Sequence, residues 1–256
     1  MGKLLKFELS KIKKIKSIYI CSIIMVLTLF INFLTLWGME YLTGELADAE
    51  LGMMEMFFQN DMITSVLSAA SNGSFTMLCG IVIALFVCSD YSQGTVKTVV
   101  AKGFSRTRIY FAKLVSVAVM SVLMYLIVIL FGWLFGMMFF GFDAPTDARW
   151  LGVLAVQFVS AIAFAAFAFF LSAVLRKSAL AIVMLIAIPT VLELVLTLID
   201  LFAETHIGDY WITTVFTMLS QASVELDRII ISLVLSLAYV VVFIVSGWAI
   251  SRKYSY

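Results

Sequence analysis

Charged residues are scarce in this sequence. They make up 13% of its 256 residues, while apolar residues make up 63%. Soluble proteins hold about 25% charged residues, so these few polar side chains could not cover the surface of a water-soluble fold. The 22 Phe and 14 Met exclude a disordered chain, and with only two Pro no Pro-rich linker divides the sequence. The composition predicts a multi-spanning membrane protein with one transmembrane domain over residues 1–256.

The groups that enzymes need are also lacking. The single histidine, His206, lies beside Glu204 and Asp209, and one His cannot supply the paired ligands of a HExxH metal site. No GxSxG motif offers a nucleophile, and no GxxxxGK[ST] loop offers an ATP site. We therefore expect no catalytic, cofactor-binding or metal-binding residues in this chain. Active transport would take its energy from an ion gradient or from a separate ATPase.

Small residues recur within the apolar stretches. Gly132 and Gly136 form a GxxxG pattern, which lets two helices approach closely in a membrane. Three cysteines also lie in apolar stretches, at Cys21, Cys79 and Cys88. We interpret them as small buried hydrophobic residues rather than as disulfide partners or metal ligands.

Six stretches are long and apolar enough to cross a bilayer, which takes about 20 residues in a helix. They cover residues 18–39, 62–87, 109–140, 151–175, 179–201 and 229–250. The second has a more polar start around residues 68–74. Apolar residues do not alternate with a period of two, which argues against a transmembrane barrel. The fold class predicted is an all-α membrane protein with six transmembrane helices.

The charges are divided between the two sides of these segments. All of the 17 basic residues except Arg149 and Arg228 fall in the N-terminal segment, in the connections after the second and fourth segments, and at the C-terminus. Acidic residues instead crowd the other connections. By the positive-inside rule both termini and the basic connections are cytoplasmic.

The N-terminal segment, residues 1–17, has an amphipathic pattern. Leu5, Leu9 and Ile12 recur at helical spacing, while Lys13 and Lys14 fall on other faces. This pattern predicts a helix in the inner interface, with its lysines toward anionic lipid. The alternative is a basic anchor without regular structure.

Glu193 is the one ionisable residue well inside an apolar segment. It follows Pro189 by four residues in the outer half of the fifth segment. A carboxyl at such a depth costs roughly 2.5–3.5 kcal/mol, so it should face protein or water. One interpretation is a contact for a cationic group in a translocation path. The other is a protonated or hydrogen-bonded residue between helices.

The most informative stretch is residues 90–113, DYSQGTVKTVVAKGFSRTRIYFAK. It predicts a short helix from Gly94 to Ala101 that stops at Gly103, followed by a helix that Ser105 caps and that continues into the third segment. A short helix joined rigidly to two spans would act as a lever. An ordinary basic connection is the alternative.

This stretch resembles the segment after the second span in ABC-2 type transporter permeases. The matching residues are Asp90, Gly94, Thr95, Gly103, Ser105, Arg106 and Lys113. The resemblance extends to the basic amphipathic N-terminus, the six spans and the length. It also includes residues 211–219, an apolar run too short to cross, which in that family forms short re-entrant helices between spans five and six.

The resemblance implies the transmembrane subunit of a bacterial exporter in the cytoplasmic membrane. Two permeases, identical or paralogous, would form the path and dock cytoplasmic ABC ATPase subunits, which would bind ATP and Mg. Nucleic acid is not an expected partner. The ATPase contacts implied for this chain are Asp90, Gly94, Thr95, Val96, Lys97, Gly103, Ser105 and Arg106. The expected cargo is an amphipathic or antimicrobial peptide, a lipid or a drug.

Three other classes of protein stay open at this point. An ion-coupled carrier or channel would work without an ATPase, and Glu193 would then be its first candidate residue. A membrane-embedded enzyme is disfavoured by the missing reactive groups. A membrane anchor or sensor would bind an ATPase and transport nothing.

Overall fold

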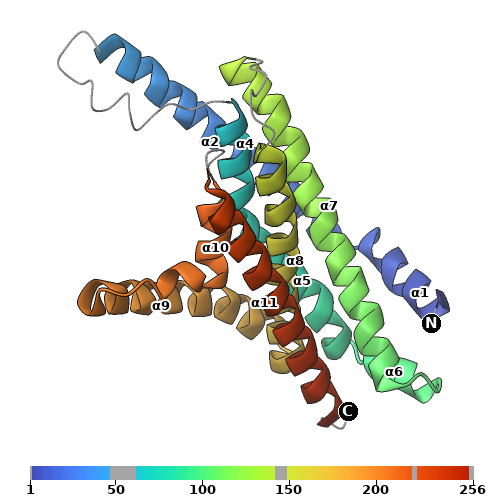
Figure 1. Ribbon diagram of the computed structural model, residues 1–256. Coiled ribbons are helices and arrows are strands. Elements are labelled where there is room, and N and C mark those ends of the chain that lie inside the picture. The colour runs from blue at the N-terminus through green and yellow to red at the C-terminus, as the bar shows by residue number, and fades with distance from the viewer. Residues whose placement is uncertain (1, 47–61, 142–148, 221–223, 254–256) are drawn as a thin grey trace.

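The computed structural model describes residues 2–46, 62–141, 149–220 and 224–253, which are mainly helical (Figure 1). Within these ranges six helical segments are long and apolar enough to cross a membrane, which confirms the six predicted from the sequence. The helices are α1 (Gly2–Ile12), α2 (Lys16–Leu46), α4 (Met62–Ser71), α5 (Gly73–Ser92), α6 (Thr95–Ala101), α7 (Arg106–Phe140), α8 (Arg149–Leu175), α9 (Ser178–Ala203), the 3-10 helix η1 (Gly208–Tyr210), α10 (Ile212–Met218) and α11 (Leu226–Lys253).

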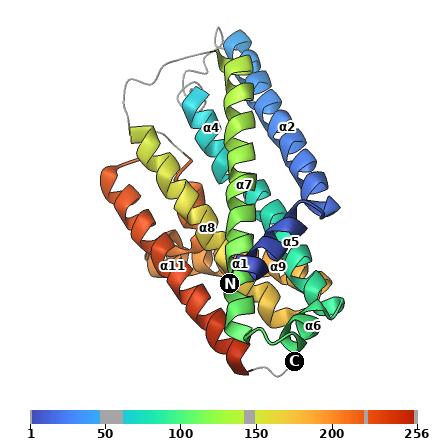
Figure 2. The same cartoon turned by 90° about the vertical axis from the view of Figure 1, so that its right-hand side faces the viewer.

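The long helices form a bundle with two distinct ends. The short helix α6, the start of α7 and the end of α11 lie together at one end, at the bottom of Figure 1. The start of α4, the end of α7 and the start of α8 lie at the opposite end, as Figure 2 also shows. We call the end that holds α6 the basic end, because the predicted basic connections lie there.

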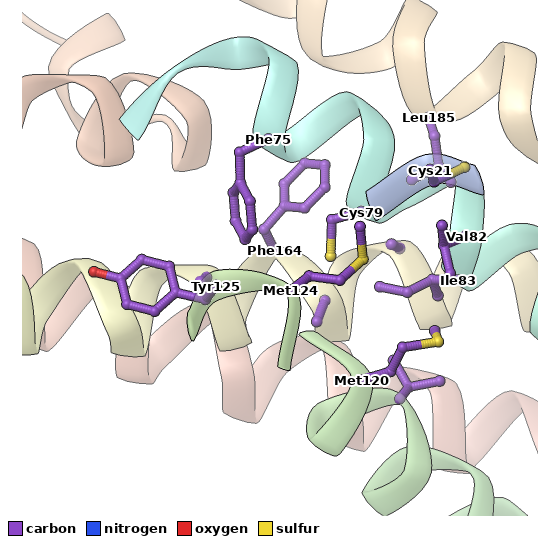
Figure 3. Close-up of a cluster of buried hydrophobic side chains, with 14 of the residues drawn as sticks. Cys21, Phe75, Cys79, Val82, Ile83, Met120, Met124, Tyr125, Phe164 and Leu185 are labelled. Atoms are coloured by element: carbon purple, nitrogen blue, oxygen red, sulfur yellow. The ribbon is translucent and has the colours of Figure 1, made fainter. Parts of the chain in front are cut away.

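Helices α5 and α8 form the centre of the bundle. In the spans Met62–Ser92 and Arg149–Leu175, 61% of the residues in the most apolar stretch are buried. In the corresponding stretches of α2, α9 and α11 the buried share is 22% or less. Figure 3 shows part of the core around these central helices, where side chains from α2, α5, α7, α8 and α9 meet. The outer helices therefore present their apolar side chains away from the protein, as helices in contact with lipid do.

Small residues allow close packing at the positions that the sequence indicated. Gly132 and Gly136 of α7 face α4, and a Cβ atom on Gly136 would lie 3.1 Å from Met62 Cγ. All three cysteines are free and buried, as predicted: Cys21, Cys79 and Cys88.

The second predicted span is present but interrupted at Asn72, within the more polar stretch that the sequence marked at residues 68–74. Helix α4 ends at Ser71, and Asn72 has the extended dihedral angles φ −65 and ψ 141. The Asn72 side chain accepts a hydrogen bond from Ser74 N at 3.1 Å and so caps α5. Asn and Ser compete for backbone hydrogen bonds and favour such caps over a helix interior.

Gln157, a fully buried residue of α8, joins four segments of the bundle. Its Nε2 donates to the carbonyl oxygens of Leu67 at 3.0 Å and Leu219 at 2.7 Å. Its Oε1 accepts from the Tyr125 hydroxyl at 3.2 Å. These bonds tie α4, α7 and the end of α10 to the central helix, and sequence analysis did not identify Gln157.

Helix α9 leaves the bundle at a steep angle, with η1 and α10 running back along it (Figure 1). Its buried residues are Ala181, Leu185 and Pro189, all in its first half, where it packs on α5 and α8. Beyond Pro189 most of its apolar side chains are exposed, Leu194 and Phe202 among them. The fifth predicted span is therefore present as a helix, but it does not run parallel to the others.

We predict that Gln157→Leu weakens the attachment of α10. The substitution removes the donor to Leu219 O, and an unsatisfied buried polar group costs about 1–3 kcal/mol. Hydrogen exchange in detergent should show faster exchange of the α10 amides in this variant. Tyr125→Phe is the matched control, because it leaves both Nε2 bonds in place and should leave α10 protected. Unchanged exchange in Gln157→Leu would contradict the assignment.

Candidate functional site

A buried carboxylate, Asp90, lies where four helices meet at the basic end. Asp90 is near the end of α5 and is only 3% exposed. Lys113 Nζ of α7 donates to its Oδ2 at 2.6 Å, and Lys11 Nζ of α1 donates to its Oδ1. Thr95 Oγ1, from the first residue of α6, lies 3.0 Å from both Oδ1 and the carbonyl oxygen of Asp90. One side chain thus binds α1, α6 and α7 to α5.

A second acidic residue, Glu8, completes the cluster. Glu8 is 2% exposed, and its Oε2 lies 3.8 Å from Lys11 Nζ, an ion-pair separation that is too long for a hydrogen bond. Burial raises the pKa of the Glu8 carboxyl above its ordinary value, and the nearby charges of Lys113 and Lys11 oppose this only in part. Two acidic and two basic side chains therefore meet in one largely buried cluster, which we call the Asp90 cluster.

Aromatic contacts extend the cluster toward α8. Lys113 Nζ lies 5.1 Å from the centre of the Tyr91 ring, and Arg176 Cζ lies 5.5 Å from the same ring. Both distances are within the range of cation–π attraction. Tyr91 therefore connects Lys113 with the loop that follows α8, so the Asp90 cluster reaches a fifth part of the fold.

Glycines set both ends of α6. Gly94 precedes the helix with φ +67, and Gly103 follows it with φ +86. Residues that carry a side chain rarely adopt this left-handed backbone conformation, whereas Gly adopts it without steric cost. The two tight turns hold α6, seven residues long, between α5 and α7. The predicted stop at Gly103 is confirmed, and the helix begins at Thr95, one residue after the predicted start.

Helix α6 has an inner and an outer face. Val96 is 4% exposed, and Val99 and Val100 pack against a small apolar cluster formed by Leu4 of α1 with Ile109 and Ala112 of α7. The outer face is exposed and consists of Lys97, Thr98 and Ala101. The inner face fastens α6 to the bundle, and the outer face is free to contact another molecule.

Ser105 and Arg106, two predicted site residues, follow the turn at Gly103 and begin α7. Ser105 is at the N-cap position of α7, with φ −66 and ψ 144, but its side chain makes no capping hydrogen bond. The expected side-chain cap is therefore wrong, and the extended backbone alone starts the helix. Arg106, the first residue of α7, is exposed.

Glu193 lies far from the Asp90 cluster along α9. Its carboxylate is exposed, and Oε2 accepts a hydrogen bond from Thr213 Oγ1 of α10 at 3.3 Å. A neighbouring carboxylate, Asp200, accepts from Thr205 Oγ1 and from the backbone N–H groups of Ile207 and Gly208, and so holds the turn after α9. The hydrogen-bonded interpretation of Glu193 agrees with this geometry.

Sequence analysis singled out Asp90 and Thr95 but missed their partners Glu8 and Lys11. Lys113 appeared only as part of the sequence pattern. A signal was present, because Glu8 and Asp90 are the only acidic residues in the sequence segments assigned to the basic side. A buried carboxylate needs cationic partners. These two acidic residues could therefore have predicted that lysines lie beside them in the fold.

We predict that Asp90→Asn destabilises the fold by about 3–5 kcal/mol, because it leaves Lys113 buried without its carboxylate. The double variant Asp90→Asn/Lys113→Met should recover part of this loss, and a double-mutant cycle of thermal unfolding in detergent measures the coupling. The exposed pair of Arg228 and Asp209, 3.5 Å apart, is the control. Asp209→Asn should cost less than about 1 kcal/mol. Additive effects at Asp90 and Lys113 would contradict the assignment.

We predict that the stability of the Glu8→Gln variant, relative to the native chain, increases as the pH rises. The pKa of Glu8 is raised in the folded protein, so its contribution is complete below its ordinary value of 4.5 and is lost as the pH passes through the folded-state pKa. Gln keeps the shape and cannot ionise. The unfolding temperature of Glu8→Gln relative to the native chain should therefore increase between acidic and neutral pH. A difference that stays constant or falls would show that Glu8 is not destabilised by burial.

Comparisons with known proteins relate the chain to two uncharacterised bacterial proteins, one of which is named a membrane protein. The uncharacterised protein YhcI of Bacillus subtilis is 32% identical over 133 residues, covering 43% of this chain and 42% of that protein. The chain thus spans less than half the length of this relative. The uncharacterised membrane protein YdbK of Bacillus subtilis is 23% identical over 178 residues, covering 66% of this chain and 72% of that protein.

A family comparison covers most of the chain. Residues 60–255 match the family described as "Protein of unknown function (DUF2705)". The match takes in α5, α6 and α7, with Asp90 and Lys113, and leaves out α1, with Glu8 and Lys11. This multi-helix membrane protein belongs to the DUF2705 family.

Proposed function

We propose that the protein is the membrane-spanning subunit of an ATP-driven exporter, and that α6 is the helix through which a separate ATPase drives it. The observation that carries this proposal is the mounting of α6. The helix presents Lys97, Thr98 and Ala101 outward, while Thr95 and Val96 fasten it to the bundle. A force applied to the outer face would be passed on to other helices rather than absorbed in a loose connection.

The Asp90 cluster supports such transmission. Lys11, Lys113 and Thr95 connect α1, α7 and α6 to the end of α5 through a single carboxylate. A buried ionic cluster resists gradual deformation, because separating its charges leaves each of them unpaired in a poorly solvated site. Movement of α6 would therefore carry the ends of α1, α5 and α7 with it. ATP and Mg would bind in the partner subunit.

The orientation proposed follows the positive-inside rule. The basic end would face the cytoplasm of a bacterium, with both termini and α6 on that side. Helix α1 would lie in the inner interface, and α10 would dip back from the outer side. This orientation places α6 where a cytoplasmic ATPase could reach it.

A second permease is the partner proposed within the membrane, either another copy or a paralogue. The support is the exposed apolar surface of α9 beyond Pro189, which includes Leu194, Leu198 and Phe202. The path would form between the two permeases. The cargo class proposed is an amphipathic or antimicrobial peptide, a lipid or a drug. The acidic connections on the side opposite the basic end would attract a cationic cargo. Two parts of these connections, residues 47–61 and 142–148, lie outside the described residues.

Co-purification of an ATPase tests the proposal. The tagged protein is extracted from its own cells in a mild detergent, and the ATP-hydrolysing subunit that remains bound is measured. Ala101→Trp places a large side chain on the outer face of α6, where a docked partner would have to move. We expect the bound ATPase to fall by about tenfold or more, the size of effect seen at central interface residues.

The control variant introduces the same tryptophan side chain at a position outside α6. Lys177→Trp puts the same side chain on an exposed residue between α8 and α9, and it should retain the ATPase. An intact protein that carries no ATPase would contradict the proposal, as would an Ala101→Trp variant that retains it. Transport driven by an ion gradient in liposomes without an ATPase, and lost in Glu193→Gln, would instead establish an ion-coupled carrier.

A further inference from the structure

A groove with a volume of about 360 Å³ opens beside the Asp90 cluster, between the end of α1, the start of α2 and the end of α5. Polar side chains line it on all three sides: Lys11, Lys14, Ser17 and Gln93. Its apolar lining includes Leu85 and Phe86 of α5. A groove that combines cationic and hydrogen-bonding groups with an apolar wall suits an amphiphile with an anionic head.

The free charge in the groove is positive. Asp90 is the only acidic residue in its lining, and both of its carboxylate oxygens already accept hydrogen bonds from lysines. Lys14 is exposed, and no carboxylate of the described residues pairs with it. An ammonium group without a partner beside hydroxyl and amide groups matches the oxygen acceptors of a phosphate.

The position of the groove favours a lipid over a soluble anion. Lys16 starts the α2 span and Ser92 ends the α5 span, so the groove lies where two membrane-crossing helices reach the interface. Headgroups occupy this depth. The adjoining face of α2 is apolar and exposed at Ile20, Ile23 and Leu27, which gives acyl chains a surface to lie against.

We propose that this groove binds the phosphate headgroup of an anionic phospholipid, with Lys14 as its main cationic contact and Lys11, Ser17 and Gln93 around it. The headgroup would lie against α1, α2 and α5 together. Lys11 would then contact both the lipid phosphate and Asp90, which links the charge of the bilayer to the Asp90 cluster. The proposal is independent of any ATPase partner.

Native mass spectrometry of the purified protein tests the proposal. The protein is held in a zwitterionic detergent and titrated with phosphatidylglycerol, or with phosphatidylcholine for comparison. We expect saturable binding of phosphatidylglycerol that phosphatidylcholine does not reproduce. Lys14→Ala should weaken it by at least about tenfold, the equivalent of one hydrogen bond to a charged group. Photo-crosslinking with a headgroup-labelled phosphatidylglycerol should label the peptides that contain Ser17 and Gln93.

Lys13→Ala is the matched control, because Lys13 is the exposed neighbour of Lys14 and does not line the groove. It should bind phosphatidylglycerol nearly as the native chain does. Leu85→Trp fills the groove without changing its charge and should abolish the saturable binding. Equal losses in Lys13→Ala and Lys14→Ala would reveal diffuse surface attraction and overturn the proposal. Displacement of the lipid by an equal concentration of inorganic phosphate would show that the site takes a free anion, and would overturn it too.

Discussion

A carboxylate removed from water costs several kcal/mol unless cations and hydrogen-bond donors surround it. Asp90 meets that requirement with Lys11, Lys113 and Thr95, each from a different helix. The arrangement of α1, α5, α6 and α7 at the basic end therefore depends on the ionic contacts of Asp90, together with the small apolar cluster beneath α6. Apolar packing alone orders membrane helices weakly, because the lipid tails that compete for their surfaces are as apolar as the side chains. The buried charges fix the relative positions of the helices.

A different polar contact holds the opposite half of the bundle. Gln157 is buried in α8 and hydrogen-bonds to backbone carbonyls of Leu67 and Leu219 and to Tyr125. One of these carbonyls, that of Leu67, belongs to α4, the helix that ends just before the break at Asn72. Other polar contacts also cross the bundle, such as the hydrogen bond between Ser160 Oγ of α8 and Ser236 Oγ of α11 at 2.7 Å and the one from the Tyr110 hydroxyl of α7 to the Ile244 carbonyl oxygen at 3.0 Å. Irregular backbone in a membrane protein is tolerated where protein groups satisfy it, and Asn72 caps α5 in that way.

The groove and α6 share the Asp90 cluster as a common support. Lys11 lines the groove and bonds Asp90, while Thr95 bonds the same carboxylate from the start of α6. A ligand in the groove and a partner on α6 would therefore act on adjacent parts of one ionic cluster. Coupling between two sites requires that each favours a different arrangement of a shared element. For the two proposed sites, the Asp90 cluster would be this shared element.

The sequence by itself determined the six apolar helices, the basic and acidic sides and the short helix bounded by Gly94 and Gly103. These features depend on composition, length and local backbone preference, which neighbouring residues encode. It also marked Asp90, through a carboxylate placed among basic residues. Only the tertiary structure decided that Glu8, Lys11 and Lys113 meet there, because the residues are separated by long stretches of chain and brought together by helix packing. The same holds for Gln157, the break at Asn72 and the course of α9, since hydropathy reports how apolar a segment is and not what it packs against.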